Sequence, residues 1–170
     1  SLFVTLQELN TINQPQLREE LLKCCGSSTW GKMMMAYFPA DSLDELLEHA
    51  EEMWYECSED DWKEAFTYHP RIGDMESFAK KFASTATWAA GEQGGINTAS
   101  AETIEALADG NKKYEEKFGY IFIVCATGKP AGEMLSVLRS RLSNSPSEEI
   151  KIAASEQNKI TKLRLQKLLE

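Results

Sequence analysis

Signals that begin and end helices recur along almost the whole chain, and they constrain its fold more than any other feature. Ser42 to Glu45 form a capping-box pattern, and Ser58 to Asp61 open a second helix in the same way. Ser145 to Glu148 combine a cap with a proline in the first helical turn. At 170 residues, the chain is therefore expected to form a single compact all-α domain of about eight helices over residues 1–170.

Other helices are expected from start and stop residues and from apolar residues at helical spacing. They are predicted over Thr5 to Ile12, Gln16 to Cys25, Trp30 to Phe38, Met75 to Phe82, Ser100 to Phe118 and Lys129 to Leu142. Ser28 or Thr29 is the expected cap of the third of these helices. On the helix from Ser100 to Phe118, the pattern places Ile104, Leu107, Ala108 and Tyr114 on one apolar side.

The run from Tyr120 to Ala126 has the strongest strand propensity in the chain, but nothing else in the sequence reads as a strand to pair with it. Two alternatives remain. The run is either a buried extended segment, whose backbone groups find partners on helices or on a ligand, or the start of a buried helix.

Charge and cysteine content narrow the classes of function. A net charge of -9 argues against nucleic acid or an anionic membrane surface as partner. No apolar run approaches the roughly 18 residues that span a bilayer. The four cysteines have no disulfide or metal-ligand pattern, so reduced thiols and a cytoplasmic location are expected. A peroxisomal location stays open if a targeting signal has been trimmed.

His69 is the one titratable ring that the sequence forces off a helix. Pro70 disfavours the α conformation for the residue before it, and Gly73 lets the backbone turn again. With an ordinary pKa of about 6.5, a histidine on such a bend is either a packing residue or a group that moves protons near neutral pH. His49, by contrast, lies on an acidic helix face and is interpreted as structural.

Arg164 and the dipeptide Glu92-Gln93 are the other polar features that stand out. Arg164 falls on a line of the last helix with Ala153, Gln157, Ile160 and Leu168. A buried arginine needs an anionic partner, so the alternatives are an internal salt bridge and an anionic ligand. Glu92-Gln93 lies between glycines, which is typical of either an exposed helix end or a site where a ligand approaches the backbone.

Several groups of residues follow one another in a specific order. They are His69-Pro70 with Ile72-Gly73, Trp88 before Glu92-Gln93, the segment Tyr114 to Tyr120 with Phe122-Ile123, and Lys159-Ile160 with Leu163-Arg164-Leu165. In this order they resemble the OHCU decarboxylase family, where OHCU is 2-oxo-4-hydroxy-4-carboxy-5-ureidoimidazoline. The resemblance covers nearly the whole chain, and no single motif carries it.

The resemblance implies a cofactor-free enzyme of urate breakdown, with no metal site, that decarboxylates OHCU to S-allantoin on an all-α fold usually found as a homodimer. His69 is similar to the family's catalytic histidine, expected as proton donor, and Arg164 to its arginine on the last helix. Glu92 and Gln93 are similar to its substrate-binding pair, and we group Glu92 with His69 and Arg164 as expected catalytic residues. The expected substrate-binding residues are Pro70, Ala89, Gln93, Phe122, Ile123, Val124, Cys125 and Ala126. The chain departs from the family at Ala89, where a serine is common.

Two other functions are compatible with the sequence. A non-catalytic helical interaction module would keep the same core without needing the polar residues to converge. A cysteine-dependent hydrolase would need His69 near Cys57 or Cys125, and Cys125 lies inside an apolar run that makes it a poor nucleophile.

Overall fold

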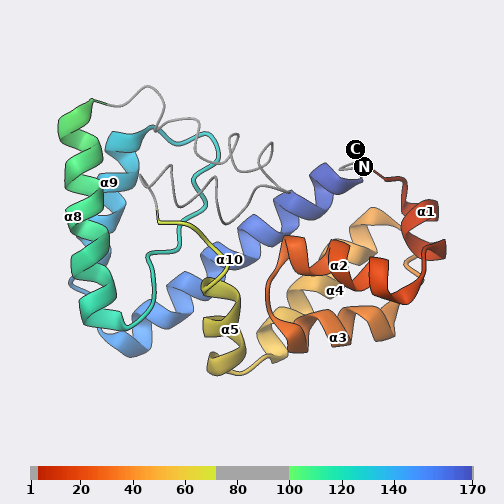
Figure 1. The fold of residues 1–170 in the computed structure, drawn as a ribbon. Coiled ribbons are helices and arrows are strands. Elements are labelled where there is room, and N and C mark those ends of the chain that lie inside the picture. Colours follow the sequence, from red (N-terminus) through yellow and green to blue (C-terminus); the bar gives the residue numbers. More distant parts are fainter. Residues whose placement is uncertain (1–3, 72–99, 170) are drawn as a thin grey trace. The chain divides into compact units, whose positions relative to one another are not determined.

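The computed structural model describes residues 4–71 and 100–169. These residues form eight α-helices and no β-strand (Figure 1), which confirms the all-α fold class. The helices are α1 (Leu6–Thr11), α2 (Gln14–Cys24), α3 (Ser28–Tyr37), α4 (Leu43–Glu56), α5 (Glu59–Phe66), α8 (Ala101–Phe118), α9 (Ala131–Arg141) and α10 (Pro146–Leu168). The helix predicted from Met75 to Phe82 lies outside the described residues. None of the described helices is long and apolar enough to cross a membrane.

The chain divides into two compact units. One unit comprises Ser1–Ala65 and Gln157–Glu170, and the other comprises Phe66–Glu156. The last helix, α10, contributes residues to both units. A single domain over residues 1–170 stays a prediction.

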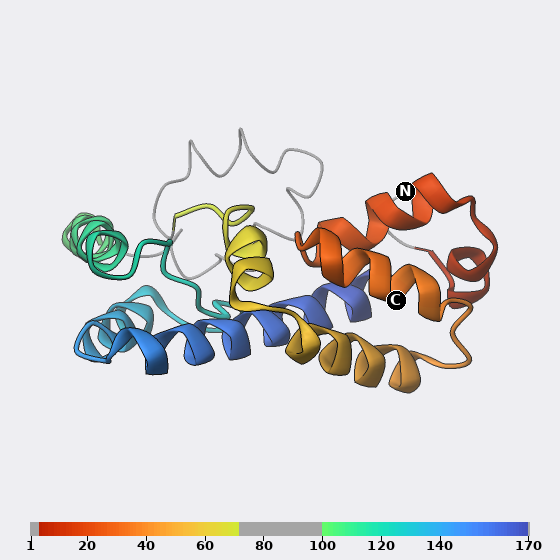
Figure 2. The same cartoon turned by 90° about the horizontal axis from the view of Figure 1, so that it is seen from below.

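In the first unit, α2, α3 and α4 pack in sequence order (Figure 2). Their core includes Trp30, Met34 and Trp54, which are almost completely buried. The Trp30 indole donates a 3.0 Å hydrogen bond from Nε1 to the backbone carbonyl of Ala50, so α3 is fixed to α4 by a polar contact inside the apolar core. His49 stacks on the ring of Tyr37 at 3.8 Å between centroids, a packing role that agrees with its structural interpretation.

The cap of α3 differs from the prediction by one or two residues. Ser27, not Ser28 or Thr29, is the N-cap, and its Oγ accepts a 3.1 Å hydrogen bond from the Trp30 amide. Ser28 Oγ instead donates to Glu64 Oε1 at 3.0 Å, and Thr29 Oγ1 donates to Asp61 Oδ1 at 2.8 Å. These two hydroxyls were therefore not available as caps, because they connect the first turn of α3 to carboxylates of α5.

In the second unit, α8 and α9 lie side by side (Figure 1). Leu107 and Tyr114 are buried as predicted, but Ala108 is exposed. Ala108 lies about 100° around the helix from Leu107, whereas Gly110 lies within about 60° of it. A Cβ atom at Gly110 would come within 2.6 Å of Leu138 Cδ2. The absence of a side chain therefore allows α9 to approach closely, and Gly110 is buried.

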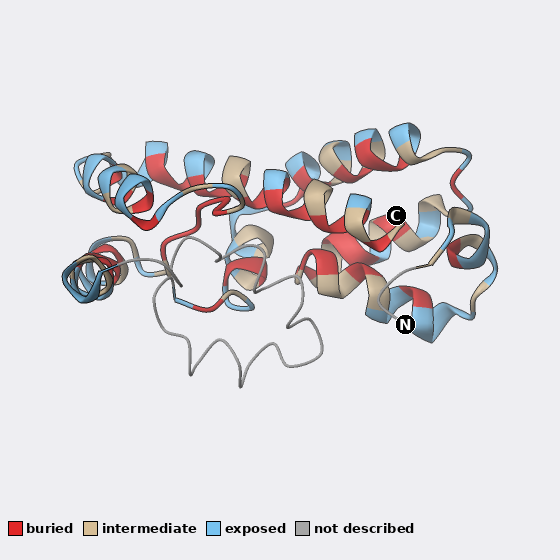
Figure 3. Cartoon of the chain, turned by 90° about the horizontal axis from the view of Figure 1, so that it is seen from above, coloured by how far each residue is buried: buried red, intermediate tan, exposed pale blue. Residues whose placement is uncertain are grey.

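The line of residues predicted on α10 is confirmed as a buried stripe. Ala153, Gln157, Ile160, Arg164 and Leu168 are all less than 9% exposed. Figure 3 shows buried positions recurring along this helix. Arg164 is therefore a buried guanidinium, as its position in the stripe indicated.

Candidate functional site

The predicted site residues fall into three groups. His69, Pro70 and the segment Phe122–Ala126 belong to the second unit, and Arg164 belongs to the first. Ala89, Glu92 and Gln93 lie outside the described residues. The structure therefore describes the local surroundings of the first two groups, and the convergence of all three stays a prediction.

His69 lies on a bend, as the proline after it predicted. Helix α5 ends at Phe66, and the His69 amide donates to the Phe66 carbonyl at 3.2 Å. The His69 side chain is partly exposed, while Pro70 is buried. The imidazole is thus presented by the segment that directly follows a buried helix end.

An ion pair follows this bend directly. Arg71 Nε contacts Glu115 Oε1 at 2.6 Å, and Arg71 Nη2 donates to Glu115 Oε2 at 3.0 Å. Two parallel hydrogen bonds of this kind restrict orientation as well as distance. The chain is therefore attached to α5 before His69 and to α8 after Pro70, which limits where the imidazole can move.

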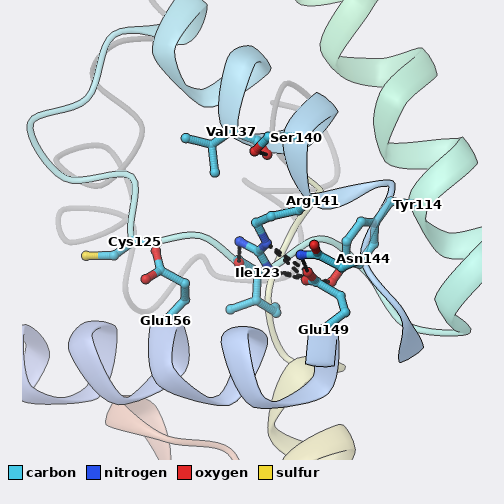
Figure 4. Close-up of polar contacts among 9 residues, drawn as sticks. All are labelled: Tyr114, Ile123, Cys125, Val137, Ser140, Arg141, Asn144, Glu149 and Glu156. Carbon is cyan, nitrogen blue, oxygen red and sulfur yellow. Dashed lines mark hydrogen bonds and ion pairs between the residues drawn. The ribbon is translucent and has the colours of Figure 1, made fainter. Parts of the chain in front are cut away.

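The segment Phe122–Ala126 is buried and lies outside any helix or strand, as Figure 3 shows in red. This confirms the first of the two alternatives for the run. Its backbone groups use side chains as partners: Arg141 Nη1 donates to the Ile123 carbonyl at 2.7 Å, and the Cys125 amide donates to Glu156 Oε1 at 3.0 Å (Figure 4). Helices α9 and α10 thus supply two of the hydrogen bonds that a neighbouring strand would otherwise make.

Arg141 is itself held by a buried carboxylate. Its Nη2 and Nε atoms contact Glu149 Oε2 at 2.6 and 3.0 Å, and Glu149 is completely buried. Asn144 Nδ2 donates to the other carboxylate oxygen at 3.0 Å, and the Tyr114 hydroxyl donates to Oε2. The arginine also lies 4.6 Å from the centroid of the Phe122 ring. The positive and negative charges compensate each other, and the remaining polar atoms of the carboxylate are occupied by neutral donors.

Burial and the hydrogen bond to Glu149 raise the pKa of Tyr114. The phenol therefore stays protonated at neutral pH and acts as a donor to the carboxylate. This fixes the direction of each hydrogen bond in the network of Tyr114, Arg141, Asn144 and Glu149, which we call the α9–α10 network.

Sequence reasoning missed the α9–α10 network. Arg141 looked like a basic residue at a helix C-terminus and Glu149 like an acidic residue in a first turn, both of which are ordinary surface patterns. One signal was present: continuing the buried stripe of α10 four residues before Ala153 reaches Glu149. Glu156 gave no such signal, because it is only half-buried and its partner is a backbone amide.

In the first unit, Arg164 is 8% exposed, and its Nη1 donates to the Lys23 carbonyl at 3.4 Å. Burial raises the pKa of the Cys25 thiol, and the positive charge of Arg164 opposes this rise only weakly. The guanidinium thus contacts the backbone of α2, and its role in ligand binding stays a prediction. No group of three or more His, Cys, Asp or Glu side chains in the described ranges could hold a metal ion.

The cysteines do not have the properties of nucleophiles. None of the four forms a disulfide, and all of them are buried. Burial raises the pKa of Cys25 to about 12 and that of Cys57 to about 11. The thiolate is the reactive form, and a thiol with a pKa near 11 is ionised in about one molecule in a thousand at pH 8.

We therefore expect the folded protein to react slowly with Ellman's reagent at pH 8, with four thiols titrating only after denaturation. The absorbance of the released thionitrobenzoate measures both values. One thiol that reacts within seconds in the folded protein would contradict this account of the cysteines and support a cysteine-dependent activity.

Comparison with known proteins gives a consistent result. The sequence model of the OHCU decarboxylase family matches residues 10–166. The uric acid degradation bifunctional protein TTL of Arabidopsis thaliana is 40% identical over 157 residues, which cover 88% of this chain and 46% of the relative. This chain thus spans about half the length of that relative. The 2-oxo-4-hydroxy-4-carboxy-5-ureidoimidazoline decarboxylase of Haloferax volcanii is 24% identical over 163 residues, covering 95% of this chain and 94% of the relative.

A solved structure shows the same fold. The crystal structure of an OHCU decarboxylase in the presence of (S)-allantoin superimposes with a TM-score of 0.73 at 39% sequence identity. The match covers 88% of this chain and 96% of that chain. Sequence and fold therefore agree over nearly the same extent.

Proposed function

This chain belongs to the OHCU decarboxylase family of urate degradation, and from that membership we propose that it is a carboxy-lyase that converts OHCU to (S)-allantoin without a cofactor. The observation that carries the proposal is the match to a solved OHCU decarboxylase over 96% of that chain, at 39% identity. A partial match would leave room for a shared core with another activity.

The reaction does not need an external electron acceptor. The carboxylate of OHCU is attached to a carbon next to a C=N bond, so the electron pair released with CO₂ can pass into that bond. The carbon that loses CO₂ also carries the hydroxyl, and it becomes the carbonyl of allantoin as the hydroxyl proton is lost. A proton must then be delivered to one face of the neighbouring carbon, which carries the ureido group. The protein's task is therefore to place the substrate and deliver the proton.

We propose that His69 donates this proton. A histidine can donate a proton near neutral pH, and delivery from a single position would fix the handedness of the product. The bend at His69, attached to α5 and α8 on its two sides, supports a restrained position for the imidazole. We propose that the His69 imidazole forms hydrogen bonds near the substrate carboxylate and hydroxyl.

Glu92, Gln93 and Arg164 are proposed to hold the rest of the substrate. A carboxylate such as Glu92 can accept hydrogen bonds from ureido or ring N–H groups, and Gln93 can both donate and accept. Arg164 would orient an oxygen with its planar fork. We place it on ring or ureido oxygens, because a buried cation held tightly on the leaving carboxylate would stabilise the ground state and slow the loss of CO₂.

Pro70 and the backbone of Phe122–Ala126 are proposed to line the same pocket. Ala89 cannot supply the hydroxyl that a serine would offer there, so we expect this substitution to affect fine positioning more than the reaction itself. A homodimer and a cytoplasmic location are part of the same proposal. The homodimer rests on the family resemblance, and the cytoplasmic location rests on the reduced thiols.

The function is tested by generating OHCU in place from urate with the two upstream enzymes and measuring the release of CO₂. We expect the initial rate to rise in proportion to the concentration of this chain. A rate equal to that of spontaneous decay at every concentration would contradict the proposal and favour the non-catalytic interaction module.

A further inference from the structure

We propose that Glu156 and Arg141 are positioning residues of the decarboxylase reaction, an inference that rests on the proposed function. Neither side chain is required to touch the substrate. Each instead fixes the orientation of one peptide group in the segment Ile123-Val124-Cys125, whose backbone is proposed to line the pocket.

The planarity of the peptide group links these two contacts to the backbone of Val124. In a trans peptide, the C=O of one residue and the N–H of the next point in opposite directions. Arg141 Nη1 holds the Ile123 carbonyl at 2.7 Å, so the Val124 N–H is directed away from Arg141. Glu156 Oε1 holds the Cys125 N–H at 3.0 Å, so the Val124 carbonyl is directed away from Glu156.

Two side chains therefore set the direction of both polar backbone groups of Val124. Val124 is buried, and its side chain is apolar. A donor and an acceptor on one residue match a ureido group, which carries both an N–H and a C=O. Fixing their direction before binding removes the cost of ordering them in the complex.

The two restraints differ in strength. Arg141 is held by the completely buried Glu149, by contacts to two of its nitrogens, and by the Phe122 ring below it. Glu156 is half-buried and forms its contact from the surface of α10 (Figure 4). Glu156 is therefore the residue chosen for substitution, because its side chain is only half-buried.

The test uses two variants of Glu156 and one control in the OHCU assay. Glu156→Met keeps the length of the side chain and removes the acceptor, while Glu156→Gln keeps an acceptor oxygen and removes the charge. Glu148→Met makes the first change at an exposed position of the same helix. Thermal melting followed by circular dichroism checks that all three remain folded.

We expect Glu156→Met to lower kcat/KM by about 10- to 100-fold, mainly through kcat, because misplaced binding groups spoil the reactive geometry. Glu156→Gln should recover activity to within about threefold of the parent chain, since its oxygen can accept the same hydrogen bond. Glu148→Met should match the parent.

Unchanged kcat and KM in Glu156→Met would overturn the inference while leaving the proposed function intact. Equal losses in the Met and Gln variants would also overturn it, because the charge and not the hydrogen bond would then matter. An inactive parent chain would instead refute the proposed function, and the inference with it.

Discussion

Replacing His69 with alanine is expected to lower kcat for OHCU decarboxylation by about 10²- to 10⁴-fold, the range that general acid catalysis contributes. The imidazole is partly exposed, so its removal leaves no buried cavity and the fold should persist. Circular dichroism at the wavelength of (S)-allantoin follows the rate and the handedness of the product together. The remaining slow reaction should lose its preference for the S product, because the proton would then arrive from solvent.

The chain provides a matched control for this experiment. It has two histidines, and His49 stacks on Tyr37 in the first unit with no assigned role in the reaction. His49→Ala should therefore retain the kcat of the parent chain. If His69→Ala decarboxylates OHCU as fast as the parent and yields S product, the role assigned to His69 is wrong.

Replacing Glu149 with alanine is expected to lower the free energy of unfolding by about 3–5 kcal/mol, because it leaves the Arg141 guanidinium buried without its anionic partner. Two more donors, Tyr114 and Asn144, would lose their acceptor at the same time. Urea denaturation followed by tryptophan fluorescence measures the change.

An exposed ion pair is the control for this second effect. Lys113 Nζ lies 3.1 Å from Asp109 Oδ2 on α8, with both side chains more than 60% exposed. Lys113→Ala should change the free energy of unfolding by less than about 1 kcal/mol.

The double variant Arg141→Met/Glu149→Leu should recover much of the stability lost in Glu149→Ala, since apolar residues can replace a buried pair. A Glu149→Ala variant as stable as the parent would show that the pair is not buried in solution.

Much of the fold was predictable because it depends on local signals. The Ser42 cap, the stop at Gly119 in the left-handed conformation and the buried stripe of α10 were each encoded within a few residues. The cap of α3 could not be predicted from nearby residues. The choice between Ser27 and its neighbours depends on carboxylates of α5 that are more than 30 residues away.

The candidate site divides in the same way. The bend at His69 follows from Pro70 alone, and the burial of Phe122–Ala126 follows from its composition. The partners of that segment could not be predicted, because Arg141 and Glu156 are joined to it by contacts that have no sequence period. The sequence indicates only that the backbone groups of this segment need hydrogen-bond partners. The structure identifies two of these partners as side chains of α9 and α10.

A crystal structure of this chain with (S)-allantoin would test the central claim most directly, because it reports the pocket, the pose and the polar partners at once. We expect the His69 imidazole, the Glu92 carboxylate and the Arg164 guanidinium to lie within hydrogen-bonding distance of one bound molecule. Allantoin bound elsewhere, with these three groups directed into separate regions of the protein, would contradict the account.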